Sequence, residues 1–137
     1  MSGVLALKPF RRPRLWLGLW LAAVAAVIVL SLVNLSGLPP VPEGGDKVEH
    51  FLAYALLSAA AVQLFAARRG CVVAAALLVG LGIGLEFAQG ALTATRMADP
   101  RDALANTLGA LAGLATVLTP LRGLLLAIDA WLWPARR

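Results

Sequence analysis

The sequence has little from which a cross-link or a common metal centre could be built. Among 137 residues there is one cysteine, Cys71, and one histidine, His50. A single cysteine excludes an internal disulfide and any cysteine-based metal site. A zinc site with one histidine would need carboxylates as its other ligands, which is uncommon. We therefore expect no metal ion and no other cofactor.

Charge is also scarce, because 14% of the residues are charged and 61% are hydrophobic. This composition lies far outside the range of soluble globular domains and predicts membrane spans. The net charge of +5 does not indicate nucleic-acid binding. The basic residues flank apolar runs and do not line one exposed face. Membrane lipids are therefore the expected surroundings of the chain.

The apolar runs predict an all-α fold, a four-helix transmembrane bundle with a short C-terminal interfacial helix. The first run has roughly 21 uncharged residues, enough to cross a hydrocarbon core of about 30 Å, and it lacks a signal-peptide cleavage pattern. The last apolar run is too short to cross and is expected at the interface. The predicted parts are a basic N-terminal segment at 1–14, spans at about 15–35, 46–67, 71–92 and 102–119, and the interfacial helix with a basic tail at 120–137.

The basic residues predict the orientation of these spans. Nine of the twelve lie on one side of the predicted membrane, and Lys47, Arg96 and Arg101 lie on the other. The positive-inside rule then places both termini in the cytoplasm. The nine are Lys8, Arg11, Arg12, Arg14, Arg68, Arg69, Arg122, Arg136 and Arg137.

Small residues in the third and fourth predicted spans indicate where helices pack closely. Gly80, Gly82 and Gly84 recur in the third span. Gly109 and Gly113 form a G-x-x-x-G pattern in the fourth, which allows two helix backbones to approach each other.

Polar side chains gather in two stretches, residues 46–54 and 86–113, both at the predicted outer side. Lipid cannot solvate such groups, so each needs a protein partner or water. We expect the two stretches to meet and to form a polar pocket near the outer membrane surface. The candidate binding residues are Asp46, Lys47, His50, Tyr54, Glu86, Gln89, Arg96, Asp99, Asp102 and Asn106.

Glu86 and His50 are the candidates for acid–base chemistry. Glu86 lies inside a span, where an ionised carboxylate needs a cation, and an ionisable group at this depth indicates function more often than a structural ion pair. Its possible cationic partners are His50, Lys47, Arg96 and Arg101.

Several other residues also have structural explanations. Asp102 could be an N-cap, Asn106 could link two helices, and Lys47 and Tyr54 could extend toward the headgroups. A divalent ion held by Glu86, Asp99 and Asp102 is conceivable, but no pattern in the sequence favours it.

Three patterns in this order resemble the VanZ-like family. They are D-K-x-x-H-F-x-x-Y from Asp46, E-x-x-Q from Glu86, and R-x-x-D-x-x-D-x-x-x-N-x-x-G-x-x-x-G from Arg96. The resemblance covers roughly residues 46–113 and implies a small multi-pass protein of the bacterial plasma (inner) membrane. The family's namesake is associated with resistance to the glycopeptide teicoplanin, so the resemblance also implies a role in the cell envelope.

Three functions remain open at this point. In the first, the outward pocket binds an anionic headgroup or a lipid-linked cell-wall precursor. Arg96 and Lys47 hold the anion, with Arg101 as a further candidate, and these cations are oriented by Glu86, Asp102 and Asn106. In the second, the protein is an intramembrane transferase or hydrolase acting on a lipid-linked substrate, with His50 or Glu86 as the general base. In the third, it is a structural subunit that docks on a membrane protein partner through the C-terminal helix with Trp131 and Trp133.

Overall fold

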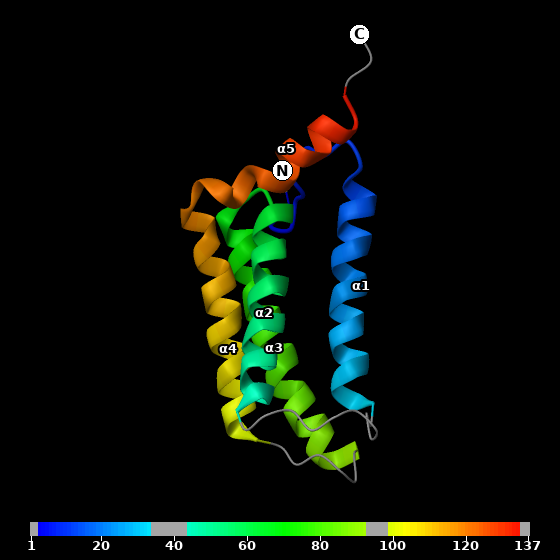
Figure 1. Ribbon diagram of the computed structural model, residues 1–137. Coiled ribbons are helices and arrows are strands. Elements are labelled where there is room, and N and C mark those ends of the chain that lie inside the picture. Colours follow the sequence, from blue (N-terminus) through cyan, green and yellow to red (C-terminus); the bar gives the residue numbers. More distant parts are fainter. Residues whose placement is uncertain (1–2, 34–43, 93–98, 135–137) are drawn as a thin grey trace.

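The computed structural model describes residues 3–33, 44–92 and 99–134, and these residues are helical in all their regular elements (Figure 1). The predicted all-α class is therefore confirmed for this part of the chain. The only β-type pairing in it is an isolated bridge between Leu7 and Phe65. The helices are α1 (Pro13–Leu32), α2 (Gly45–Leu64), α3 (Arg68–Leu92), α4 (Pro100–Ala115) and α5 (Leu124–Leu132), with 3-10 turns η1 (Thr116–Leu118) and η2 (Pro120–Gly123) before α5.

Prolines set the boundaries of α1, α4 and η2. Pro13 and Pro100 begin α1 and α4, where the missing N–H costs no intrahelical bond. The N-cap of α4 is Asp99, whose side chain accepts a hydrogen bond from the Arg101 amide at 2.9 Å. The expectation that Asp102 is this cap is wrong, and Asp102 lies in the first turn instead. Pro120 cannot continue the preceding helix, and the axis turns by 81° there.

Two helices, α1 and α3, are long and apolar enough to cross a membrane. The bent pair of Pro100–Leu118 and Pro120–Leu132 adds a third if it forms one span. The other long helix, α2, carries Asp46, Lys47 and Glu49 in its first turns, which lowers its apolar character. The structure thus supports a membrane protein, while four separate spans stay a prediction.

The closest helix contact joins α4 to α2, and it depends on glycine. A Cβ atom added at Gly109 would overlap the Phe51 carbonyl oxygen of α2, and one at Gly113 would lie 2.7 Å from the Ala59 nitrogen. The predicted approach through the G-x-x-x-G pattern is confirmed. On α3, an added Cβ at Gly82 would lie 3.1 Å from Tyr54 Cε1.

The same prediction is wrong for two glycines of α3. Added Cβ atoms at Gly80 and Gly84 would have no described neighbour within 4 Å. These two residues therefore do not form a packing face against another described helix.

In contrast, α1 stands beside the other helices and is loosely attached to them (Figure 1). None of its residues is buried in the described structure. Trp20 Nε1 donates to the Leu57 carbonyl at 2.9 Å, and at the opposite end Gln89 Nε2 donates to the Ser31 carbonyl at 2.8 Å. Trp20, Val24 and Val27 also pack against the core cluster formed by the other helices, so α1 contacts them along its length.

The N-terminal segment and α5 meet at the end of the bundle where α1 and α3 begin (Figure 1). Asp129 of α5 is 1% exposed and accepts hydrogen bonds from the Arg11 amide at 2.5 Å, the Arg12 amide at 3.3 Å and Trp16 Nε1 at 2.8 Å. Lys8 Nζ donates to the carbonyls of Val62 and Arg122. These contacts tie both ends of the chain to α2 and α1.

Candidate functional site

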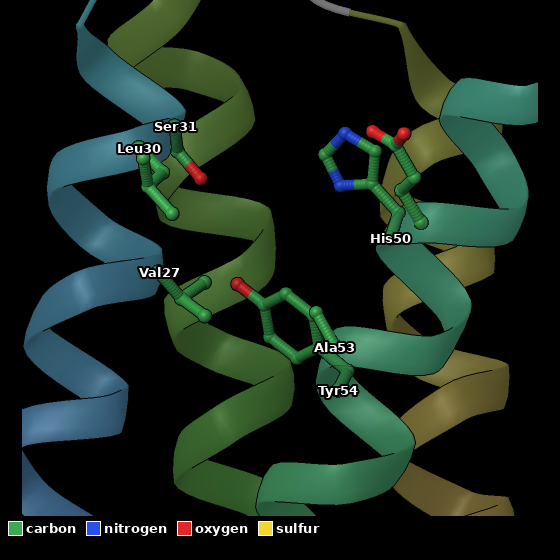
Figure 2. Close-up of a pocket in the computed structure, with 7 residues that line it drawn as sticks. Val27, Leu30, Ser31, His50, Ala53 and Tyr54 are labelled. Carbon is green, nitrogen blue, oxygen red and sulfur yellow. The ribbon is translucent and has the colours of Figure 1, made fainter.

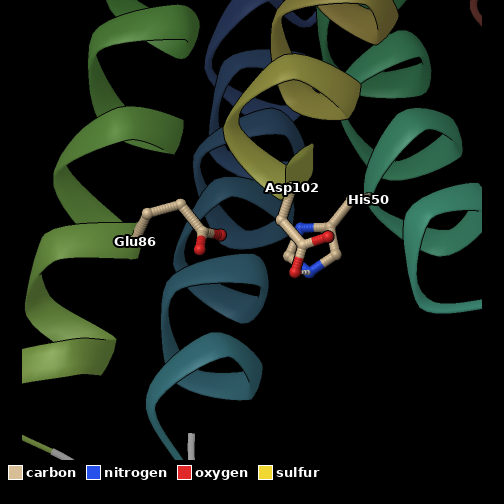
Figure 3. Close-up of side chains that lie close together, drawn as sticks. All are labelled: His50, Glu86 and Asp102. Atoms are coloured by element: carbon tan, nitrogen blue, oxygen red, sulfur yellow. Dashed lines mark ion pairs between the residues drawn. The ribbon is translucent and has the colours of Figure 1, made fainter. Parts of the chain in front are cut away.

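Polar side chains meet at the opposite end of the bundle, where α2 and α4 begin and α3 ends. Figure 3 shows His50 of α2, Glu86 of α3 and Asp102 of α4 directed toward one another. One nitrogen or oxygen atom from each lies within 4.8 Å of the others. Glu86 is 5% exposed, and His50 and Asp102 are half-buried. The two polar stretches of the sequence therefore come together in space, as expected.

His50 is held in place through both ring nitrogens. Nδ1 lies 3.0 Å from Asn106 Oδ1, and Nε2 lies 3.7 Å from Asp102 Oδ2. Asn106 is 1% exposed. The amide oxygen of Asn106 can only accept, so this contact is assigned as a hydrogen bond donated by Nδ1, which leaves Nε2 facing Asp102. A ring nitrogen that faces a carboxylate is favourable when a proton or another cation lies between them.

Lys47 is engaged by three carboxylates at the rim of this site. Its Nζ lies 3.0 Å from Asp46, 3.3 Å from Asp99 and 3.4 Å from Asp102. The hydrogen bond from the Arg101 amide, followed by that from Lys47, holds the pKa of Asp99 below its ordinary range although burial opposes this. Lys47 is thus not free to hold an anionic ligand unless it leaves these aspartates.

Glu86 accepts a hydrogen bond from the Asp99 amide at 3.2 Å. In the described part of the chain, no ion pair joins it to Lys47, His50 or Arg101 within 4.0 Å. The expected cationic partner is therefore absent from these residues. Arg96, the remaining candidate from the sequence, lies outside the described residues.

The other predicted residues lie deeper or to one side. Tyr54 is one turn below His50, is 1% exposed, and its hydroxyl has no hydrogen-bond partner among the described residues. Gln89 donates a hydrogen bond to Ser31 of α1, so it reaches α1 as well as sharing a helix with Glu86.

A pocket of about 230 Å³ adjoins the site between α1 and α2 (Figure 2). Its lining includes His50, Tyr54 and Glu49 of α2 and Ser31 of α1. A larger apolar groove of about 530 Å³ follows the same two helices toward Trp16 and Leu125. The pocket and the groove share Val27 and Ala53 in their linings, so they adjoin each other along the seam between α1 and α2.

Sequence reasoning gave no role to two residues that prove informative. Glu49 is exposed and lines the pocket beside His50. Asp129 accepts hydrogen bonds from three N–H groups at the start of α1. Burial alone would raise the pKa of Asp129, but the hydrogen bonds from Arg11, Trp16 and Arg12 hold it below its ordinary range. The sequence feature that could have indicated a structural role for Asp129 is its position as a carboxylate inside an apolar run.

The charges around the site do not balance among the described residues. Asp46, Glu86, Asp99 and Asp102 contribute four carboxylates, and Lys47 forms ion pairs with the three aspartates. His50 adds a positive charge only when it is protonated. The arrangement therefore attracts a proton or a cation.

Comparisons with protein-family models, with curated proteins and with solved structures gave no significant match to this chain.

Proposed function

We propose that this chain is a multi-pass protein of the bacterial plasma membrane in which α1 to α4 each cross the bilayer. At 1.5 Å per residue, the 20 residues of α2 give a length of roughly 30 Å, which matches the hydrocarbon core. The bend at Pro120 supports an interfacial position for α5, as does Trp131, which is 79% exposed. The resemblance of residues 46–113 to VanZ-like proteins supports the same assignment.

The charge distribution supports an orientation with both termini in the cytoplasm. The basic residues of the N-terminal segment, of the start of α3 and of η2 belong to the end of the bundle that holds α5. Lys47 and Arg101 belong to the other end, near the starts of α2 and α4. The positive-inside rule then places the His50 site at the outer surface.

We further propose that the site binds the phosphate-bearing headgroup of a lipid-linked cell-wall precursor. The observation that carries this proposal is that the pocket beside His50 adjoins the apolar groove between α1 and α2. A lipid with a long chain needs apolar contact along the membrane and polar contact at its head. The groove offers the first and the pocket beside His50 and Tyr54 offers the second.

The groove between α1 and α2 gives such a lipid a route of entry. It is lined from α1 by Trp16, Trp20 and Val27, so a hydrocarbon chain lying in it would contact the same side chains that pack α1 on the other helices. The groove is lined mainly by aliphatic and aromatic side chains, for which a hydrocarbon chain is an equivalent neighbour.

The test uses Ala53, which lines both the pocket and the groove. Ala53→Trp would fill the passage, so the purified protein should lose binding of a polyprenyl phosphate presented in mixed micelles. Leu77→Trp is the matched control, because Leu77 of α3 is exposed and lines neither depression. Equal binding by the parent and both variants would refute the groove as the lipid site.

An intramembrane transferase or hydrolase is the second candidate, and the fixed imidazole favours it. Asn106 and Asp102 orient His50, as a general base requires. Release of phosphate from a polyprenyl diphosphate by the parent, lost in His50→Gln and Glu86→Gln while the lipid still binds, would support catalysis. A structural role beside a membrane protein partner is less favoured, because Asp129 and Trp133 of the C-terminal part contact the chain's own N-terminal part.

A further inference from the structure

Three helices each contribute one ligand-type side chain to the centre of the site. These are His50 from α2, Glu86 from α3 and Asp102 from α4, with ligand atoms mutually within 4.8 Å (Figure 3). An imidazole with two carboxylates is a donor set that suits divalent transition metals. Convergence from three helices differs from an acidic patch on one surface, because the packing of the helices fixes the geometry.

The distances fit a metal with small adjustments. Two ligands on a tetrahedral ion with bonds of about 2.0–2.1 Å lie roughly 3.4 Å apart. His50 Nε2 and Asp102 Oδ2 are 3.7 Å apart. Glu86 has a flexible side chain that can close the remaining gap.

The contacts around the three residues also resemble those that support a bound metal. A metal-binding histidine donates its other N–H to a carbonyl or carboxylate oxygen, which fixes the tautomer and the ring orientation. Asn106 Oδ1, 3.0 Å from His50 Nδ1, occupies that position. Asp102 Oδ2 faces the imidazole, while Lys47 Nζ lies 3.4 Å from Oδ1 and competes with a bound cation for this carboxylate.

A second, independent observation is a buried hydroxyl without a partner. Tyr54 is 1% exposed, and no described residue forms a hydrogen bond with its hydroxyl. Its ring packs on α3 at Gly82, one turn before Glu86. Figure 2 shows this hydroxyl directed away from α2 into the pocket that His50 also lines. An unpartnered buried hydroxyl at this place points to a ligand or a metal-bound water that is part of the site.

We propose that His50 Nε2, Glu86 and Asp102 bind one divalent transition-metal ion such as Zn²⁺, with open coordination positions toward the pocket. The inference departs from the expectation of no metal, which rested on the single histidine and cysteine. Two carboxylates neutralise the charge of the ion, and the ion relieves the opposition between the imidazole lone pair and the carboxylates. The alternative is an imidazolium ion paired with Asp102 and no metal.

The ion would also supply the positive charge that a phosphate headgroup needs. This step rests on the proposed lipid function, whereas the metal site itself does not. Phosphate oxygens are good ligands for a divalent ion, and Lys47 is already occupied by aspartates.

The test measures Zn²⁺ itself on the purified full chain in detergent, after treatment with a chelator and without added lipid. We expect one ion per chain by equilibrium dialysis. The affinity should fall at least about 100-fold in Glu86→Gln, and roughly 10- to 100-fold in Asn106→Ala, which removes the outer partner of His50. Leu77→Ala is the control, because Leu77 is exposed on α3 and lies nine residues, more than two helical turns, before Glu86, and the affinity of this variant should stay within about threefold of the parent.

Two results would overturn the proposal. One is a parent protein that retains no Zn²⁺, and the other is an unchanged affinity in Glu86→Gln. Circular dichroism of each variant checks that the helices are intact, and if Asn106→Ala misfolds, the nearly isosteric Glu86→Gln decides alone.

The failures of the two proposals are distinguishable. Ala53→Trp should block the polyprenyl phosphate while Zn²⁺ still binds. Zn²⁺ binding by a parent that binds no lipid would refute only the proposed function. Lipid binding that is equal in the parent and Glu86→Gln, with no Zn²⁺ in either, would refute only the metal site.

Discussion

The close approach of α4 to α2 should make Gly109 intolerant of even one methyl group. Gly109→Ala places a Cβ atom onto the Phe51 carbonyl oxygen, and the obstacle is backbone that cannot rotate away. Overpacking of this kind costs about 1–3 kcal/mol, while alanine regains up to about 1 kcal/mol of helix propensity. Because the overlap is with backbone, we take the upper half of that range and expect a net loss of roughly 1–2 kcal/mol.

Gly80→Ala is the matched control for this prediction. The two positions carry the same chemical change in a helix, but an added Cβ at Gly80 would meet no described atom within 4 Å. This variant should be neutral or more stable by up to about 1 kcal/mol. Reversible unfolding in mixed detergent micelles, followed by circular dichroism, measures both variants against the parent.

The same substitution should also reach the functional site. Phe51 adjoins His50 on α2, and Gly109 lies one turn after Asn106 on α4. Separating the two helices would lengthen the 3.0 Å contact between His50 and Asn106, so Zn²⁺ affinity should fall together with stability in Gly109→Ala. Equal stability and equal Zn²⁺ affinity in Gly109→Ala and Gly80→Ala would refute the reasoning, because positions 109 and 80 would then have equal room for an added methyl group.

Three further predictions concern single polar side chains. The pKa of Asp129 is lower in the folded protein than in the unfolded chain. Its charge therefore stabilises the fold fully above the unfolded-state pKa of about 4, and this stabilisation is lost as the pH falls through the lower folded-state pKa. The melting temperature should therefore drop on acidification below about pH 4, and Asp129→Asn should start lower and show a flatter profile in the same titration. Lys47→Met should tighten Zn²⁺ binding, because it removes a competing cation from Asp102, and weaker Zn²⁺ binding in dialysis would contradict this assignment. Tyr54→Phe removes a buried hydroxyl without a described partner, so stability should stay within about 1 kcal/mol of the parent, and a larger loss would show that the hydroxyl has a partner in solution.

The sequence was a good guide where the governing signal is local. Uncharged apolar runs and prolines predicted each helix to within a few residues, because hydrophobic content and the missing proline N–H act along the chain. The meeting of His50 with Glu86 also followed, since alternating helices return the start of one to the end of the next. The role of Gly109 followed from spacing alone.

The errors arose where the answer depends on how helices are rotated against each other. Asp99 and Asp102 are both plausible N-caps by residue type, and only the three-dimensional turn assigns the cap to Asp99. Gly80 and Gly82 differ by two positions, yet only Gly82 faces Tyr54. The contact between Asp129 and Arg11 joins opposite ends of the chain, so no spacing within either segment could indicate it.

Comparison of Asp129 with Glu86 argues that the second carboxylate is there for a ligand. Both are almost fully buried, at 1% and 5% exposure. Asp129 accepts three N–H groups and lies at the N-terminus of α1, where the helix dipole stabilises an anion, so its charge is satisfied by the fold. Glu86 accepts one amide, has no ion pair among the described residues, and faces Asp102 and an imidazole. A buried carboxylate with so few partners among the described residues is costly to a membrane protein unless a further cation completes its surroundings. A carboxylate whose only task was to join helices would resemble Asp129, and Glu86 does not.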